Sequence, residues 1–276
     1  MSLLHRCAAL ALALAPLAPA AEAQAVIVLW GDSVVCGFGA DARAGTPYGQ
    51  APFGEPVADA FRWDEGRQRW TELTATQNHQ GTGADLAYGA AAAWLALHRG
   101  EGPVYVVALG VPGADVHPEM SRAQSSWAPG LVGGALERLL ERNLKPALAS
   151  LSAPRVEWVC GSAGNNMVPE WGRFGAHLRA TWRELLAAVP GSPATMMVRS
   201  YRPSDVEARA AIEASGHGVV DLDPLPHRAG GLLPDRVHLT HFGNVVAGAR
   251  VALAGLTAPR VGPRPAARAA GAARPL

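Results

Sequence analysis

The stretch AVIVLWGDSVVCGFG, residues 25–39, joins a continuous apolar run to a short polar turn that contains two glycines. An apolar run without alternating polar residues is typical of a β-strand that is buried on both faces of a parallel sheet. Ser33 follows this run, and Gly37 and Gly39 allow the chain a tight turn. We expect Ser33 at the end of the first strand, where a reactive serine and an ordinary turn or cap residue are both open interpretations.

Similar apolar runs occur later in the chain, at residues 104–109, 156–160, 194–198 and 218–222. They alternate with stretches of helical apolar spacing, at residues 84–99, 131–144, 174–189 and 244–256. This alternation predicts an α/β fold, a three-layer α/β/α sandwich around a central parallel sheet of about five strands. Ligands of such folds bind beyond the carboxyl ends of the strands, so Ser33 is expected on the functional edge of the sheet.

Both ends of the chain differ in composition from the middle. Residues 1–25 combine a basic start, an apolar core and a small-residue exit, which predicts a secretory signal and a periplasmic or secreted product. Their apolar segment is short for a membrane span, so no stable membrane insertion is expected after signal removal. Residues 258–276 are rich in Pro, Ala and Arg, which predicts a disordered tail. Residues 26–257 are then long enough for one domain.

Charge and cysteine content restrict the function classes further. The whole chain has a formal net charge of +1, and the part between the two ends has a small excess of acidic residues. This balance gives no electrostatic case for a nucleic-acid partner. Outside the signal, the cysteines are Cys36 and Cys160. One disulfide and two buried free thiols are both open alternatives for such a pair in an exported chain.

The segment LLPDRVHLTHFGN, residues 232–244, supplies an acid and a histidine before the last predicted helix. A serine hydroxyl is a weak nucleophile until a histidine takes its proton, and a carboxylate orients that histidine. Asp235 and His238 are close enough in sequence for this arrangement, although a plain polar turn is the alternative. His238 and His241 also form an H-x-x-H pattern, but no acid or cysteine cluster accompanies it, so no metal or other cofactor is expected.

Four short motifs, in this order, resemble those of the SGNH, or GDSL-type, hydrolase superfamily. They are GDS at 31–33, ALGVPGADV at 108–116, GNN at 164–166 and DRVHLT at 235–240. The G-x-S-x-G motif of other serine hydrolases is absent, in agreement with a serine near the start of the chain. The spacing in GDSVVCG is most similar to the carbohydrate-esterase branch that includes sialate O-acetylesterase-like and acetylxylan-esterase-like proteins.

The resemblance implies a role for each matched residue. Ser33 would be the nucleophile, His238 the general base and then acid, and Asp235 the residue that orients His238. The oxyanion of the tetrahedral intermediate would be held by the backbone N–H groups of Ser33 and Gly113 and by the side-chain amide of Asn166. Each such donor contributes to catalysis because it acts on a charge that exists only in the transition state.

The match departs from the family pattern at several positions. Met167 stands where the family often has an aspartate, and Val34 stands where the carbohydrate-esterase branch commonly has asparagine. The glycine block can be framed on Gly110 instead of Gly113. Asn165 is the alternative to Asn166, and both asparagines could simply form a polar turn after the preceding strand.

The stretch 40–83 is long for a connection after a first strand, and long loops at this edge commonly carry recognition. Trp63, Trp70, His79 and Gln80 could line a sugar-binding wall, or the two tryptophans could pack the loop onto the core.

Together, these observations predict an exported serine esterase that removes short acyl groups, above all acetyl, from carbohydrate or glycoconjugate esters through an acyl-serine intermediate and without a cofactor. Its substrate would be a small-molecule or polysaccharide ester. A lipid esterase or thioesterase is one alternative. An inactive carbohydrate-binding module on the same fold is another, and Met167 is the strongest argument for it.

Overall fold

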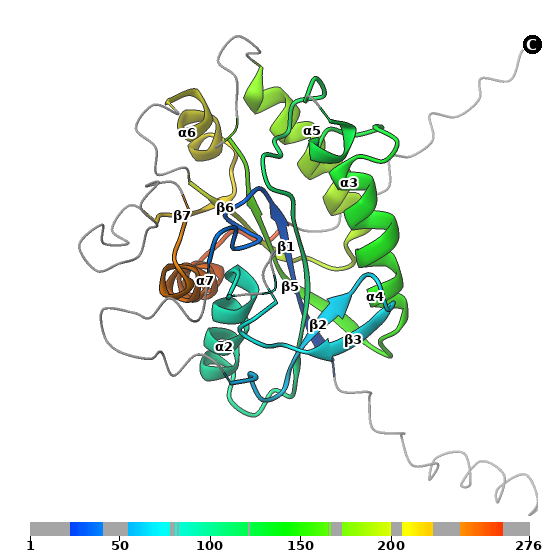
Figure 1. The fold of residues 1–276 in the computed structure, drawn as a ribbon, viewed down its shortest axis with the longest axis vertical. Helices are drawn as coiled ribbons and strands as arrows, with labels where there is room; N and C mark the ends of the chain where they lie inside the picture. The colour runs from blue at the N-terminus through cyan, green and yellow to red at the C-terminus, as the bar shows by residue number, and fades with distance from the viewer. Residues whose placement is uncertain are drawn as a thin grey trace, which may run out of the picture.

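The computed structural model describes residues 23–40, 55–77, 81, 83–120, 122–164, 166, 173–199, 206–222 and 238–261. These residues form a seven-stranded sheet in the order β3-β2-β4-β1-β5-β6-β7 (Figure 1). Neighbouring strands are parallel except β2 and β3, which form an antiparallel hairpin. The strands are β1 (Gln24–Gly31), β2 (Ala60–Asp64), β3 (Arg69–Glu72), β4 (Val104–Gly110), β5 (Pro154–Ser162), β6 (Ala194–Val198) and β7 (Gly218–Val220).

The predicted α/β class and all five predicted strands are confirmed, as β1, β4, β5, β6 and β7. Their order, β4-β1-β5-β6-β7, is the 2-1-3-4-5 order of flavodoxin-like sheets. The count of about five strands was too low because the stretch 40–83 contains the β2–β3 hairpin. Its two strands alternate aromatic with charged residues and lie at the edge of the sheet, so they lack the continuous apolar signal of the buried strands.

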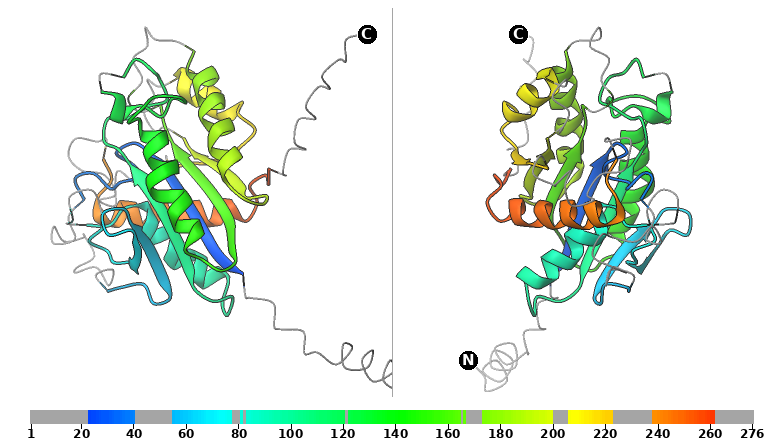
Figure 2. Two further views of the ribbon diagram at one scale, coloured as in Figure 1. Left: turned by 90° about the vertical axis from the view of Figure 1, so that its right-hand side faces the viewer. Right: turned by 60° about the vertical axis from the view of Figure 1, so that its left-hand side comes forward.

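Helices cover both faces of the sheet, which gives the expected three layers. Alternate residues of β1 enter two separate apolar clusters, one on each face. One face is covered by α2 (Leu86–Leu97) and α7 (His241–Gly255), and the left view of Figure 2 shows the helices of the other face in front of the sheet. These are α3 (Ala135–Glu137), η2 (Arg138–Leu144), α4 (Lys145–Ala149), α5 (Phe174–Ala188) and α6 (Val206–Glu213), and the short turn η1 (Ala123–Ser125) precedes them.

A proline shapes the helix that faces the β2–β3 hairpin. The segment η2 is a π-helix and leads into α4, which has Pro146 in its first turn. Pro146 has no N–H, so it cannot bond the carbonyl of Arg142 four residues earlier. That carbonyl instead accepts hydrogen bonds from Trp63 Nε1 at 3.3 Å and Gln68 Nε2 at 3.1 Å. The hairpin is thereby attached to the helical layer.

The described part of the chain differs slightly from the domain boundaries that the sequence suggests. Gln24 and Ala25, which lie within the predicted signal, are the first residues of β1. Residues 258–261, the start of the predicted tail, pack beside β6: Thr195 N donates to Pro259 O at 3.0 Å. The other residues of the predicted signal and tail, apart from Ala23, lie outside the described residues.

The fold decides between the two alternatives for the cysteines. Cys36 and Cys160 are both free and buried, and burial raises the pKa of the Cys160 thiol to about 12. The two residues therefore act as small core side chains. Among the described helices, none combines the length and apolar character that a membrane span needs.

Candidate active site

Ser33 lies in a turn that β1 leads into and that Asp32 holds in place. Asp32 is fully buried, and its carboxylate accepts hydrogen bonds from Val34 N and from Ser162 Oγ, both at 3.0 Å. The first bond closes the turn around Ser33, and the second attaches it to the end of β5. Ser33 itself is 6% exposed. The GDS motif is therefore a rigid turn with the serine at its bend.

Two glycines let this turn pack tightly against its neighbours. Gly37 has a φ of +62°, and a Cβ there would lie 2.4 Å from the carbonyl oxygen of Ala84. Gly110, the last residue of β4, would place a Cβ 2.5 Å from the backbone nitrogen of Cys36. Any side chain at Gly110 would push the Ser33 turn away from the sheet. This close approach assigns Gly110 a packing role.

The sheet order places Ser33 between two loops. In the sheet, Gly31 is paired with Gly110 of β4 on one side and with Ser162 of β5 on the other. The chain forms β4 on one side of β1 and then crosses to form β5 on the other side. Ligands of doubly wound sheets bind at such a switch point. Asn166 Nδ2 donates to Ala114 O at 3.1 Å, which joins the loop after β5 to the loop after β4. The two loops are thus connected across the end of β1, where Ser33 lies.

The buried side chain of Asp115 also connects the loops after β4 and β5. Its carboxylate accepts hydrogen bonds from Val116 N at 2.7 Å, Gly164 N at 3.1 Å and Asn166 N at 3.3 Å. The side chain is 1% exposed. Burial raises the pKa of this carboxyl to about 7, the three N–H donors oppose the rise, and the nearby charge of Asp32 adds to it.

Three hydrogen-bond donors, in the Ser33 turn and in the loops after the two flanking strands, have capacity left for a ligand. Within the described part of the chain, the backbone N–H groups of Ser33 and Gly113 donate to no protein acceptor. Gly113 has a φ of +74° and no atom near the position of a Cβ, so its peptide is sterically open. The amide of Asn166 uses one N–H on Ala114 and has a second. Donors with these properties suit an oxyanion.

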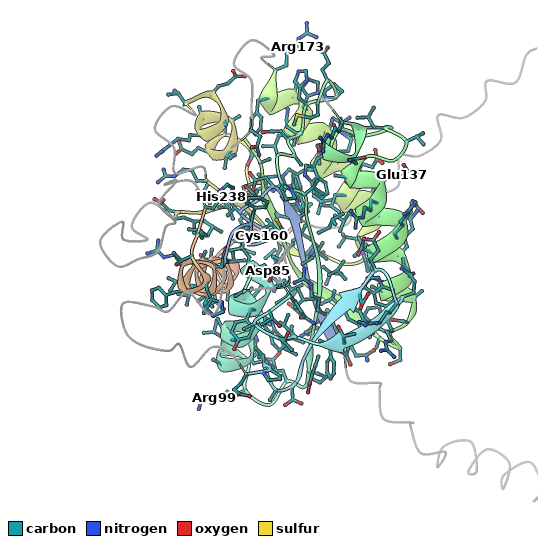
Figure 3. The ribbon with its side chains drawn as sticks, in the orientation of Figure 1. Asp85, Arg99, Glu137, Cys160, Arg173 and His238 are labelled. Atoms are coloured by element: carbon teal, nitrogen blue, oxygen red, sulfur yellow. The ribbon has the colours of Figure 1, made fainter. Side chains whose placement is uncertain are left out.

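His238 lies close to the Ser33 turn. Its ring is 5.0 Å from that of Phe38, measured between centroids, and Phe38 N donates to Ser33 O at 3.1 Å. Figure 3 labels His238 above α7, on the segment that leads into this helix. The structure contains no hydrogen bond between Ser33 Oγ and the His238 ring. Catalytic hydrogen bonds are often long before substrate binds, so the placement is compatible with a serine–histidine pair.

His241 has a different role from His238. It is buried, and its Nδ1 accepts a hydrogen bond from Ala84 N at 3.0 Å, which links α7 to the segment before α2. Within the described residues, no three His, Cys, Asp or Glu side chains gather in the way that a metal site requires.

The remaining sequence candidates divide into two groups. Asp235, Asn165, Met167, His79 and Gln80 lie outside the described residues. Trp63 and Trp70 are cross-strand partners in the β2–β3 hairpin, with ring centroids 5.3 Å apart.

The two tryptophans attach the hairpin to the core. Trp70 Nε1 donates to Ser150 Oγ at 2.8 Å, and Trp63 is 5% exposed. Trp63 also lines a cavity next to Cys36. Trp63 therefore serves the packing interpretation and also faces a space that a ligand could enter.

Asp115 and Asp32 are the structural acids that sequence reasoning missed. Asp32 lies inside the quoted GDS motif, and Asp115 follows Gly113 by two residues. Two acids beside apolar strands are unusual unless they accept several hydrogen bonds, and this signal could have identified them.

The raised pKa of Asp115 leads to a stability prediction. The carboxyl ionises near 3.8 when unfolded and near 7 when folded, so its contribution to the free energy of unfolding is full below pH 3.8 and is lost as the pH rises through 7. Asp115→Asn carries an amide that does not titrate. Urea unfolding across this pH range should show the parent losing stability relative to the variant as the pH rises. A constant difference between the two proteins would contradict the assignment.

Comparison by sequence finds no matching family model and no matching curated protein. Comparison with solved structures finds a protein from Arabidopsis thaliana, with a TM-score of 0.66, 17% identity, and coverage of 85% of this chain and 98% of that chain. A protein named NanS matches with a TM-score of 0.60, 13% identity, and coverage of 86% and 97%. An acetyl xylan esterase from Geobacillus stearothermophilus is more distant, with a TM-score of 0.45, 17% identity, and coverage of 86% and 95%.

The first two matches span nearly the whole of those chains and most of this one. Identities this low are informative about the fold alone. The described residues therefore share the fold of these two proteins, and the predicted three-layer α/β/α class is confirmed.

Proposed function

We propose that this chain is an exported serine esterase that hydrolyses short acyl esters, above all acetyl esters, of carbohydrates or glycoconjugates. The observation that supports this most is the set of available donors around Ser33: its own N–H, the N–H of Gly113 and the second N–H of Asn166. A turn or cap serine needs no such set. An acyl-transfer nucleophile does, because negative charge develops next to it in the transition state.

In the proposed mechanism, Ser33 Oγ attacks the carbonyl carbon of the ester while His238 accepts the hydroxyl proton. The carbonyl oxygen becomes an oxyanion, which the three donors stabilise. Its collapse breaks the bond to the sugar oxygen, and His238 returns the proton to that leaving oxygen. His238 then takes a proton from water as the water oxygen attacks the acyl-serine. Collapse of this second tetrahedral intermediate breaks the bond between the acyl carbon and Ser33 Oγ, His238 returns the proton to Ser33 Oγ, and the carboxylic acid leaves. Asp235 would orient the His238 ring throughout.

Turnover of p-nitrophenyl acetate by the purified protein, followed by a panel of acetylated sugars, longer acyl esters and thioesters, tests this proposal. The proposal expects acetyl esters of sugars to be the best substrates, and peptide mass spectrometry of the quenched reaction to find the acetyl group on Ser33. A preference for long acyl chains or thioesters would favour the lipid esterase or thioesterase alternative. Sugar binding without any hydrolysis would favour the inactive binding module.

Export leads to a prediction for the amino terminus. Removal of residues 1–25 would delete two residues of β1, including Gln24, whose Oε1 accepts a hydrogen bond from Ser152 N at 2.8 Å. The sequence AEA at 21–23 offers small residues where signal cleavage requires them. Intact-mass measurement of the exported protein should therefore give Gln24 as the first residue. A first residue after Ala25 would mean that β1 tolerates the loss.

A further inference from the structure

A cavity of about 260 Å³ lies at the carboxyl end of β4, and the proposed mechanism makes no use of it. Residues 108–112 line it and lead directly into Gly113. Cys36, which lines it as well, is three residues beyond Ser33, and its Sγ lies 3.6 Å from Ser33 O. The cavity therefore adjoins both the nucleophile turn and the loop of the proposed oxyanion donor.

Arg62 is the best-positioned donor in this cavity. Its side chain is 16% exposed, and its Nη1 binds the Asp85 carboxylate and donates to Gln77 O at 2.9 Å. Asp85 is itself 2% exposed and caps α2, and it is labelled in Figure 3. Asp85 and the Gln77 carbonyl thus hold the guanidinium through Nη1, so its orientation does not depend on a ligand.

The Nε and Nη2 groups of Arg62 remain available as hydrogen-bond donors. Among the described residues, Nε and Nη2 of Arg62 have no hydrogen-bond partner. Both atoms are accessible, because neither is among the buried polar atoms that lack a partner. Since Arg62 lines the cavity, these N–H groups are open to it. A planar pair of donors fits two neighbouring oxygens of a ligand.

Trp63 gives the cavity one fixed aromatic surface. Its Nε1 is already bonded to the Arg142 carbonyl that Pro146 leaves free, and its ring packs edge-on against Trp70. The indole therefore offers its ring, not its N–H, to a ligand. A cavity with a rigid aromatic side and few oriented polar groups is typical of small-molecule sites.

The charges around the cavity cancel in pairs. Arg62 is paired with Asp85, and Glu65 is paired with Arg138, whose Nη2 lies 2.6 Å from Glu65 Oε2. Because a carboxylate already neutralises each arginine, an anionic ligand would gain little net Coulomb attraction in this cavity and would bring its charge close to Asp85 or Glu65. A neutral hydroxylated ligand can accept from Arg62 without breaking either pair. The volume is near the lower end of ligand pockets, about 300 Å³, which suits a single ring.

We propose that this cavity binds an uncharged pyranose ring of the substrate, with Arg62 donating to ring hydroxyls and Trp63 contacting an apolar face of the ring. The inference rests on the proposed esterase function for the identity of the substrate, and it adds a preference for neutral over acidic sugars. That preference comes from the Arg62–Asp85 and Glu65–Arg138 pairs.

Equilibrium binding separates this proposal from catalysis. Methyl β-D-glucopyranoside and glucuronate, which share a ring but differ in charge, are titrated into the mature protein and followed by calorimetry. We expect the neutral glycoside to bind more tightly than glucuronate. Arg62→Lys keeps a cation beside Asp85 but loses the planar donors, so it should weaken binding of the glycoside about tenfold. Arg67→Ala is the matched control, because Arg67 is on the same hairpin, pairs with Asp64 and lies outside the cavity.

Glu65→Gln tests the charge argument and keeps the test available if Arg62→Lys does not fold. It releases Arg138, so the ratio of the two affinities should shift about tenfold toward glucuronate. No glycoside binding, no effect of Arg62→Lys in a folded protein, or an unchanged ratio in Glu65→Gln would overturn the cavity proposal, even if acetyl esters are hydrolysed. Glycoside binding with these effects but without ester hydrolysis would refute the esterase proposal and keep the cavity as a sugar site.

Discussion

Replacing Ser33 with alanine is expected to lower kcat for p-nitrophenyl acetate by a factor on the order of 10⁴ to 10⁶, the range found when a serine hydrolase loses its nucleophile. The change removes one oxygen from a side chain that is 6% exposed. The Asp32 hydrogen bonds to Val34 and Ser162, which hold the turn, do not involve the Ser33 hydroxyl. The thermal midpoint should therefore stay close to that of the parent while turnover is lost.

Ser152→Ala is the matched control for this substitution. Ser152 is exposed, lies just before β5 and donates to Gln24 Oε1 at the first residue of β1. It is therefore at the opposite end of β1 from Ser33. Its loss should leave kcat unchanged. Equal activity of Ser33→Ala and the parent would remove Ser33 from the chemistry and leave the GDS segment as a turn.

Asn166→Ala is expected to lower kcat by about 10² to 10³, the usual effect of removing one oxyanion donor. The side chain also donates to Ala114 O at 3.1 Å, so the variant should lose about 1 kcal/mol of unfolding free energy as well. The loop keeps its main support because Asp115 bonds the backbone N–H groups of Gly164 and Asn166. Initial rates and urea unfolding of the same preparation measure both effects.

Asn166→Asp separates the donor from the shape of the side chain. It keeps the size of the residue but has no N–H to offer an oxyanion, so its kcat should fall at least as far as that of Asn166→Ala. If Asn165→Ala shows the large loss in kcat and Asn166→Ala does not, the oxyanion donor is Asn165, and Asn166 serves only to join the two loops.

The sequence predicted the central strands well and the edge of the sheet poorly. Strands such as β1 and β6 are covered on both faces, so they appear as unbroken apolar runs. In the β2–β3 hairpin, β3 is the edge strand and β2 pairs with β4. The FRWD and RWTE segments of these two strands mix charged with aromatic residues. The glycine between them, Gly66, and the paired tryptophans were the available signal for a hairpin. Helix α6 was missed because it is short, with only Ala208 and Ile212 buried.

At the candidate site, sequence could nominate residues but could not choose between frames. Gly110 and Gly113 both fit the glycine block, and only the packing of Gly110 against Cys36 and the open peptide of Gly113 distinguish them. Asp115 depends on contacts with residues far along the chain, Gly164 and Asn166, which no local pattern encodes. The Arg62–Asp85 pair that shapes the cavity is non-local in the same way.

Catalysis by the proposed mechanism requires the Ser33 hydroxyl and the His238 imidazole to work as one unit, although they come from opposite ends of the described chain. The most direct measurement is kcat for p-nitrophenyl acetate in Ser33→Ala, His238→Ala and the double variant. Residues that act together give non-additive losses, so the double variant should be no slower than the slower single variant. Losses in the double variant equal to the product of the two single losses would show that the two side chains act independently.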